Sequence, residues 1–173
     1  MVTIDLITGF LGSGKTTFLK KYAEYLMDQG LHIGILENDF GAINVDMLML
    51  HELRGDQCEL EMIAGGCDAE SHRRRFRTKL ISMRMCGYDR VLVEPSGIYD
   101  VDEFFDVLRE EPLDQWYEIG NVIAILDARL EKNLSQQADY LLASEAANAG
   151  KVILSHADAA TREQCEDTVA HLN

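Results

Sequence analysis

The stretch Thr8 to Thr17 reads T-G-F-L-G-S-G-K-T-T and decides the fold. Gly9, Gly14, Lys15 and Thr16 satisfy the pattern G-x-x-x-x-G-K-[ST], typical of a loop whose backbone N–H groups surround nucleotide phosphates. Glycines allow positive φ and let the backbone approach an anion without a Cβ in the way. The amides then form an anion-binding concavity at a helix N-terminus, where the helix dipole also favours negative charge. The stretch therefore predicts a phosphate-binding loop between a strand and a helix.

The flanking segments agree with this prediction. Val2 to Ile7 is apolar-rich, as a buried strand should be, and Phe18 to Met27 carries apolar residues at helical spacing. A chance Gly-rich turn is therefore disfavoured. Lys15 is expected to reach the β and γ phosphates, and the Thr16 hydroxyl to ligate Mg²⁺. The nucleotide-binding residues expected in the loop are Gly9, Leu11, Gly12, Ser13, Gly14, Lys15, Thr16 and Thr17.

Composition limits the function classes. The 173 residues suit one domain that buries roughly two thirds of its unfolded-chain surface. A formal charge of −14 argues against a general affinity for nucleic acid or an anionic membrane. No apolar run approaches the roughly 20 residues that span a bilayer. The four cysteines lie far apart and no signal segment is evident, so we expect a reduced, cytoplasmic setting without a disulfide framework.

Beyond the first helix, short apolar runs alternate with helical patterns. Further strands are expected at 31–36, 90–93, 121–126 and 151–154, and helical segments at 47–53, 72–85, 101–108, 135–149 and from Thr161 as N-cap onward. The strands have continuous rather than alternating apolar character, which indicates a mostly parallel sheet covered on both faces. We expect an α/β protein with the three-layer architecture of P-loop NTPases, and a single domain over residues 1–173.

Polar residues follow two of these strands, where open α/β sheets place their ligand contacts. Glu37-Asn38-Asp39-Phe40-Gly41 follows the second strand, and its carboxylates, with Asp46, can face Mg²⁺, its water shell or a second metal. A solvated turn is the alternative for this segment. Glu94-Pro95-Ser96-Gly97 follows the strand at 90–93 and has the form of a Walker B and switch II element. There Glu94 would hold Mg²⁺ through water, and the Gly97 N–H would sense the γ-phosphate.

A candidate base-recognition loop, Ser155-His156-Ala157-Asp158, follows the last expected strand. GTP-specific P-loop proteins carry N-K-x-D there, because one carboxylate accepts both the N1–H and the exocyclic amine of guanine. Asp158 keeps this carboxylate. Ser155 and His156 replace Asn and Lys, and an imidazole can stack on the base in place of the lysine stem. Guanine is therefore preferred over adenine or over no base preference.

Two further features have open interpretations. Residues 72–79 (H-R-R-R-F-R-T-K) form the basic cluster of an acidic chain, on a helix expected to bury Phe76, Leu80 and Met83. A solvated helical face is the favoured interpretation, and a contact surface for an acidic partner or phosphate is the alternative. Cys67 follows Gly65-Gly66, and a lone cysteine more often packs than ligates a metal.

Together, T-G-F-L-G-S-G-K-T-T, the E-N-D-F-G segment with Asp46, Gly66-Cys67 and V-L-V-E-P-S-G resemble the CobW-like GTPases, which are related to HypB and UreG. The resemblance covers nearly the whole chain. It implies GTP hydrolysis coupled to insertion or trafficking of zinc, cobalt, nickel or iron. The implied ligands and partners are GTP, GDP, Mg²⁺ and a client metalloprotein or a second copy of the chain.

The chain departs from the family pattern at its metal motif. Of the family's C-x-C-C only Cys67 is present, with Ala69 and Glu70 at the other positions, and Ala42 replaces an acid. Losing two of three thiolates should weaken a Zn or Cu(I) site. A mixed site of Cys67 with Glu37, Asp39, Glu70 or His72 remains a hypothesis. The resemblance implies that family members continue past the position of Asn173 with a last strand and a C-terminal domain, so we expect that this chain either lacks these parts or is cut before them.

The implied reaction is in-line attack of water on the γ-phosphate, with Lys15, Thr16 and Glu94 as the catalytic residues. No glutamine or arginine finger is evident in the sequence, so we expect slow turnover that a partner or dimerisation completes. Two alternatives stay open. One is a nucleotide-dependent binding switch with little hydrolysis, and the other is a P-loop small-molecule kinase, whose arginine lid would have to be residues 72–79.

Overall fold

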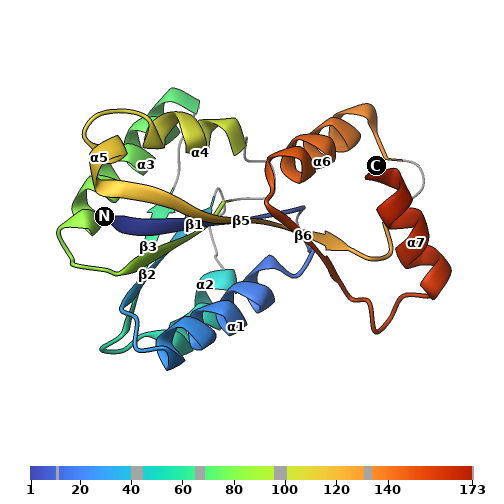
Figure 1. Ribbon diagram of the computed structural model, residues 1–173, viewed down its shortest axis with the longest axis horizontal. Coiled ribbons are helices and arrows are strands. Elements are labelled where there is room, and N and C mark those ends of the chain that lie inside the picture. Colours follow the sequence, from blue (N-terminus) through green and yellow to red (C-terminus); the bar gives the residue numbers. More distant parts are fainter. Residues whose placement is uncertain (11, 40–44, 65–68, 96–100, 131–133, 173) are drawn as a thin grey trace.

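The computed structural model describes residues 1–10, 12–39, 45–64, 69–95, 101–130 and 134–172. They form a six-stranded sheet between two layers of helices (Figure 1). The strands are β1 Val2–Thr8, β2 Ile33–Asp39, β3 Cys58–Ala64, β4 Arg90–Glu94, β5 Tyr117–Asp127 and β6 Lys151–Ser155. Their spatial order is β3-β2-β4-β1-β5-β6, and every pairing between these strands is parallel. The α/β architecture expected from the sequence is confirmed.

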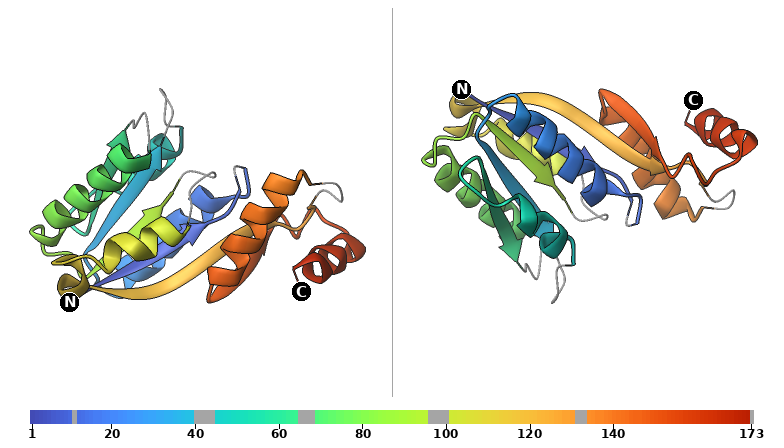
Figure 2. Two further views of the ribbon diagram at one scale, coloured as in Figure 1. Left: turned by 90° about the horizontal axis from the view of Figure 1, so that it is seen from above. Right: turned by 90° about the horizontal axis from the view of Figure 1, so that it is seen from below.

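The helices divide between the two faces of the sheet. One face carries α1 Lys15–Asp28, α2 Val45–Leu50 and the 3₁₀ turn η1 His51–Leu53. The other carries α3 Ala69–Arg84, α4 Val101–Leu108, α5 Leu113–Trp116 and α6 Gln136–Asn148. Helix α7, Arg162–His171, lies beyond β6 at the end of the molecule (Figure 2). Among the described residues, no helix combines the length and apolar character that crossing a membrane requires.

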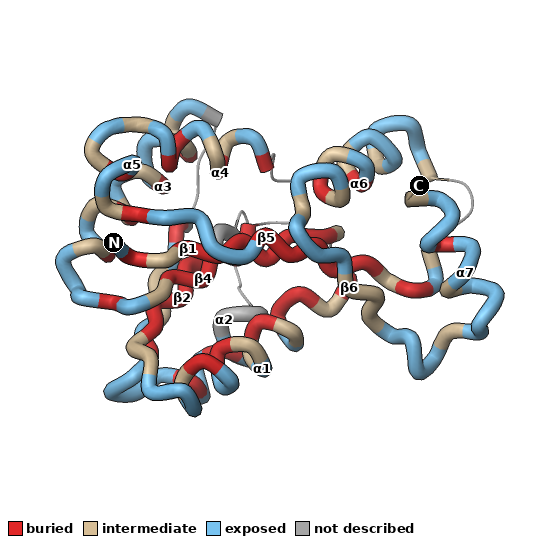
Figure 3. Tube along the Cα trace, in the orientation of Figure 1, coloured by how far each residue is buried: buried red, intermediate tan, exposed pale blue. Residues whose placement is uncertain are grey.

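Two apolar clusters join the helices to the sheet, because successive residues of a strand point to opposite faces. Ile4 and Leu6 of β1 belong to the cluster under α3, α4 and α5, whereas Ile7 belongs to the cluster over α1. The central strands are therefore buried on both faces (Figure 3), which explains their continuous apolar runs. Phe76, Leu80 and Met83 are at most 1% exposed, so the expected inner face of α3 is confirmed.

The sequence did not predict β3, so the strand at 151–155 is the sixth rather than the fifth. β3 is an edge strand, and it pairs with β2 from Ile33 opposite Cys58 to Asp39 opposite Ala64. Glu59 and Glu61 interrupt its apolar residues, because only one neighbouring strand and partial cover are present at this edge. A smaller difference concerns β5, which begins four residues early at Tyr117.

A buried carboxylate ties α1, β1, β4 and β5 together. Asp5 lies in the middle of β1 and is fully buried. Arg90 donates from Nε and Nη2 to its two oxygens over 2.6 and 3.0 Å. The Tyr22 hydroxyl (2.9 Å) and the Asn121 backbone N–H (2.6 Å) donate to the same carboxylate. The β1–β5 register shifts between Ile4 and Leu6, on either side of this residue. Four donors thus compensate the charge that burial leaves without water.

Candidate nucleotide site

The loop between β1 and α1 has the backbone shape that its sequence predicts. Gly14 is the N-cap of α1 in the left-handed conformation, with φ 89°. Gly9 and Gly12 also have positive φ, 139° and 77°. A Cβ at Gly9 would overlap the carbonyl oxygen of Ile125 on β5. Position 9 therefore requires glycine for two reasons: its φ is positive, and the neighbouring strand lies too close for a Cβ.

A cavity of about 430 Å³ opens over this loop. It is lined by loop and α1 residues together with one residue each from α2, β4 and the segment after β6, namely Gly12, Gly14, Lys15, Thr16, Thr17, Met49, Glu94 and His156. The structure thus gathers three of the separate motifs that the sequence singled out. Ser155 also lies against the loop, its Cβ 3.6 Å from where a Cβ on Gly14 would be. Asp158 is exposed and does not line the cavity.

Two side chains in the cavity make an oxygen pair. The Thr16 hydroxyl donates to Oε1 of Glu94 over 2.9 Å, and the two residues are 8% and 3% exposed. Glu37 of β2 stands beside Glu94 in the strand register and is equally buried. Hydroxyl and carboxylate oxygens are the ligands that Mg²⁺ prefers. Thr16 and Glu94 therefore have the donor chemistry that a Mg²⁺ ion needs, side by side in the cavity.

The Lys15 ammonium is held inside the loop. Its Nζ donates to the carbonyl oxygen of Phe10 over 3.0 Å, and the residue is 6% exposed. A cation at the N-terminus of α1 opposes the helix dipole and is stabilised there by loop carbonyls. An entering phosphate would satisfy the dipole, the loop amides and this ammonium together.

The sequence prediction missed Glu145, a buried acid of α6 behind the loop. It is 2% exposed, and its Oε1 accepts a hydrogen bond from the Thr8 hydroxyl over 3.1 Å. Burial raises the pKa of this carboxyl to about 7, although Thr8, the Lys15 charge and the Gly9 N–H act in the opposite direction. No described residue hydrogen-bonds to its Oε2. The sequence offered one signal for this buried acid: Glu145 stands alone among small residues, in the run A-S-E-A-A of a predicted helix.

Asp127, which was not among the predicted site residues, holds His156 of the candidate base loop in position. His156 has a φ of 53°, and its Nδ1 lies 2.9 Å from Oδ2 of Asp127 at the end of β5. Arg129 donates to the same carboxylate from Nε, Nη2 and its backbone N–H. The hydrogen bonds from Arg129 are the main cause that lowers the pKa of Asp127 to about 2. The carboxylate therefore holds the imidazole at the rim of the cavity.

Several predicted site residues cannot be placed. Leu11, Cys67 and Gly97 lie outside the described residues, and so do the side chains of Asp39 and Asp46. The described side chains contain no group of three or more His, Cys, Asp or Glu that would hold a metal ion. His72, a candidate for the mixed metal site, is buried against α4, with Nδ1 3.1 Å from Oε1 of Glu103.

The sequence of this chain is similar to those of known nucleotide-binding proteins. Residues 3–173 match the family model described as the CobW/HypB/UreG nucleotide-binding domain. The chain belongs to this family. It is 28% identical over 186 residues to the zinc chaperone YjiA of Escherichia coli (strain K12), covering 99% of this chain and 55% of YjiA. It is 31% identical over 157 residues to the zinc chaperone YeiR of the same strain, covering 87% of this chain and 47% of YeiR.

A eukaryotic protein and several solved structures are also similar to this chain. The zinc-regulated GTPase metalloprotein activator 1 of Schizosaccharomyces pombe is 24% identical, covering 91% of this chain and 37% of that protein. The chain spans about half the length of the first curated relatives it matches. The Zn(II)-bound YjiA GTPase from E. coli has a TM-score of 0.60 at 21% identity, covering 99% of this chain and 54% of that one. The receptor FtsY of Elizabethkingia anophelis with GDP has a TM-score of 0.70 at 17% identity, covering 100% and 55%. These similarities confirm the P-loop GTPase fold.

Proposed function

We propose that residues 1–173 form the nucleotide-binding domain of a Mg²⁺-dependent GTPase that serves metal trafficking or metallocentre assembly. The observation that carries the proposal is the buried Thr16–Glu94 pair beside Lys15, in a cavity floored by a glycine-dependent phosphate loop. The names of the relatives, which include zinc chaperones and a zinc-regulated GTPase metalloprotein activator, support the connection with metals.

The chain's own groups would bind the phosphates and Mg²⁺. Lys15 would exchange the Phe10 carbonyl for oxygens of the β and γ phosphates, and the amides at the start of α1 would bind the same groups. Thr16 and Glu94 would hold Mg²⁺, which neutralises the phosphate charge. The described lining of the cavity contains no glutamine or arginine that could orient the attacking water. We therefore expect slow turnover until a client protein or a second copy of the chain supplies such a group.

Guanine selection is part of the proposal. His156, held by Asp127 at the rim of the cavity, would stack on the base, and Asp158 would accept its N1–H and amine. The proposal also includes the metal that the protein would carry. Cys67 with Glu37 and Asp39 is the candidate ligand set for zinc, cobalt, nickel or iron, and equal metal stoichiometry in wild type and Cys67→Ala would contradict it. A cytoplasmic setting is a third part, with Cys58, Cys86 and Cys165 as free thiols.

The test of the proposal is phosphate release from GTP, measured by malachite green with Mg²⁺ present. Lys15→Ala should abolish release, whereas Lys21→Ala, an exposed lysine on the same helix, should release phosphate like the wild type. Calorimetric titration of GTP, GDP and ATP identifies the preferred base, and repeating it with Zn²⁺, Co²⁺ and Ni²⁺ tests coupling to metal. Equal phosphate release by wild type and Lys15→Ala would exclude the enzymatic proposal.

A binding switch with little hydrolysis is the second candidate, because the described cavity lining offers no group that activates water. It predicts tight GTP and GDP binding without turnover, even after metal or partner is added.

The kinase alternative is disfavoured by the contacts of helix α3. Arg73 and Arg77, which a phosphate-closing lid would need, both bond to Glu110, in the segment between α4 and α5, over 2.6 and 3.0 Å. Transfer of labelled phosphate to an acceptor rather than to water would restore that alternative.

A further inference from the structure

The basic cluster of α3 divides into two stripes with different surroundings. The first stripe faces the segment between α4 and α5, where its arginines are paired within the domain. Arg73 and Arg77 share the carboxylate of Glu110, and the Arg77 Nη2 also donates to the carbonyl of Glu111 over 2.8 Å. This half of the cluster stabilises the contact between α3 and the segment that joins α4 to α5, a role that neither interpretation of the sequence anticipated.

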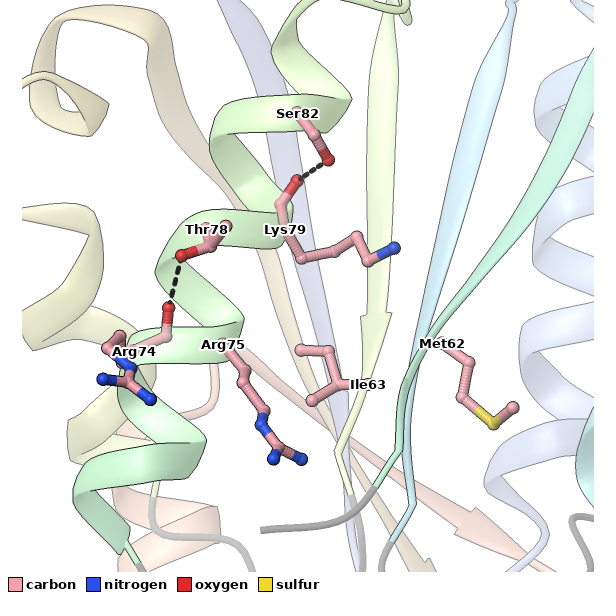
Figure 4. Close-up of a pocket in the computed structure, with 7 residues that line it drawn as sticks. All are labelled: Met62, Ile63, Arg74, Arg75, Thr78, Lys79 and Ser82. Carbon is pink, nitrogen blue, oxygen red and sulfur yellow. Dashed lines mark hydrogen bonds between the residues drawn. The ribbon is translucent and has the colours of Figure 1, made fainter.

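The second stripe faces the edge of the sheet. Together with β3 it lines a groove of about 440 Å³, here called the α3–β3 groove, whose walls include Ile63, Arg74, Arg75, Thr78, Lys79 and Ser82. Figure 4 shows Arg75 and Lys79 extending from α3 toward β3, with Ile63 reaching toward them from the strand. Because β3 is the edge strand, no further strand among the described residues pairs with it on this side.

Charge in the groove is opposite to that of the molecule. Arg74 and Arg75 are exposed, and Lys79 reaches across to Glu61 of β3 over 2.8 Å. The described lining of the groove therefore carries three cations, on the surface of a chain whose formal charge is −14. The groove attracts a carboxylate-bearing segment at short range, whereas a long polyanion would meet the repulsion of the remaining acidic surface.

The hydrogen-bonding groups of the groove indicate which kind of molecule it can bind. The Thr78 hydroxyl donates to the carbonyl of Arg74, and the Ser82 hydroxyl to that of Lys79, each over 2.8 Å. Both hydroxyl hydrogens are thereby directed into the helix, and each oxygen still presents lone pairs to the groove. The groove combines guanidinium donors with hydroxyl acceptors. A polypeptide supplies both complements, carboxylates and backbone N–H groups, whereas a phosphodiester backbone supplies acceptors alone.

We propose that the α3–β3 groove binds a short acidic segment of a partner polypeptide. Carboxylates of the segment pair with Arg74 and Arg75, and its backbone N–H groups reach the hydroxyls of Thr78 and Ser82. The site lies on α3 and β3, apart from the cavity over the phosphate loop. Its occupation therefore does not rest on the proposed nucleotide chemistry.

The test is a fluorescence-anisotropy titration with a labelled twelve-residue peptide in which glutamate alternates with alanine. The wild type should bind it, and the Arg74→Glu/Arg75→Glu variant should bind at least about tenfold more weakly, because attractive pairs become repulsive. Arg54→Glu/Arg162→Glu is the matched control, since it reverses two exposed arginines outside the groove. Circular dichroism checks that each variant is folded. If the double variant unfolds, the single variant Arg74→Glu is tested in its place.

Three comparisons decide the outcome. A peptide with glutamine in place of glutamate should not bind, and added salt should weaken binding of the acidic peptide. Lys15→Ala should bind the peptide like the wild type, which separates this site from a failure of the nucleotide site. Equal binding by wild type and the groove variants would overturn the proposal. So would tighter binding of a single-stranded RNA of equal charge, which would assign the groove to nucleic acid instead.

Discussion

Thr16 donates its hydroxyl hydrogen to Glu94 over 2.9 Å, which joins the first turn of α1 to the carboxyl end of β4. In Glu94→Gln an amide oxygen can still accept this bond, so the fold should persist while the negative charge is lost. We expect GTP hydrolysis to fall on the order of 100-fold and to need more Mg²⁺. The measurement is the phosphate-release rate across a series of Mg²⁺ concentrations.

Two glutamate variants serve as references for this prediction. Glu163→Gln changes an exposed acid of α7 and should leave the rate and its Mg²⁺ dependence unaltered. Glu37→Gln changes the buried neighbour of Glu94 in the strand register and reports whether the adjacent carboxylate shares the role. A Mg²⁺ dependence in Glu94→Gln identical to that of the wild type would remove Glu94 from the metal site.

Glu145 should make stability depend on pH. Burial raises its pKa from an ordinary value of 4.5 to about 7, so between these values the native state holds a proton that the unfolded state has released. The stability from this group is therefore fully present below about pH 4.5 and is lost as pH rises through 7, by up to about 3 kcal/mol. Glu145→Gln cannot ionise, so relative to wild type the variant should gain stability between pH 5 and 8. Urea unfolding of both proteins at the two pH values measures the difference.

Glu163→Gln again provides the control, because an exposed acid should contribute no such difference between pH 5 and 8. A parallel pH dependence in wild type and Glu145→Gln would show that this carboxyl is already ionised in the native protein at pH 5.

Asp158 should decide which base the site accepts. A carboxylate accepts the N1–H and the amine of guanine, whereas an asparagine amide can donate to the 2-oxo group of xanthine. We expect Asp158→Asn to weaken GTP binding by roughly 10- to 100-fold, the loss of hydrogen bonds to a charged acceptor. Binding of xanthosine triphosphate should strengthen. Calorimetric titrations with the two nucleotides measure this exchange, and an unchanged ratio of affinities would place base recognition elsewhere.

Asp5 should be the most costly polar residue to remove from the sheet. Asp5→Ala leaves the Arg90 guanidinium, the Tyr22 hydroxyl and the Asn121 N–H without their shared acceptor. We expect unfolding free energy to fall by about 3 kcal/mol or more, since one partner of a buried pair is left alone. Tyr22→Phe deletes a single donor and should cost about 1 kcal/mol. Urea unfolding compares them, and similar losses in both variants would show that Asp5 carries no special cost.

Local patterns were enough to predict most of the fold. The phosphate loop follows from its glycines, and the central strands follow from continuous apolar runs, because helices cover both of their faces. The capping box at Thr161 and Gln164, which begins α7, was also readable from neighbouring residues. β3 was not predicted, because Glu59 and Glu61 break the continuous apolar run that marked the other strands, and its place in the sheet depends on pairing with β2.

Long-range contacts account for what the sequence could not show. Asp5 bonds to a residue 116 positions away, and Glu145 to one 137 positions away, so no local pattern marks either acid as part of a network. The basic cluster looked like one feature, whereas Glu103 of α4 and Glu110 after α4, 31 and 37 positions from their partners, divide it into two stripes. The gathering of Thr16, Glu94 and His156 was predictable only because parallel strands end at one edge.

The network around Asp5 also constrains how related sequences can vary. A Cβ on Gly120 would overlap Oδ1 of Asp5, so position 120 tolerates a side chain only when position 5 carries a smaller or differently shaped residue. The two positions are 115 residues apart and belong to neighbouring strands, yet they should covary across homologues as one unit. The pair Asp and Gly would mark chains that keep the buried carboxylate, and its joint replacement would mark lineages that rebuilt this part of the sheet in apolar form.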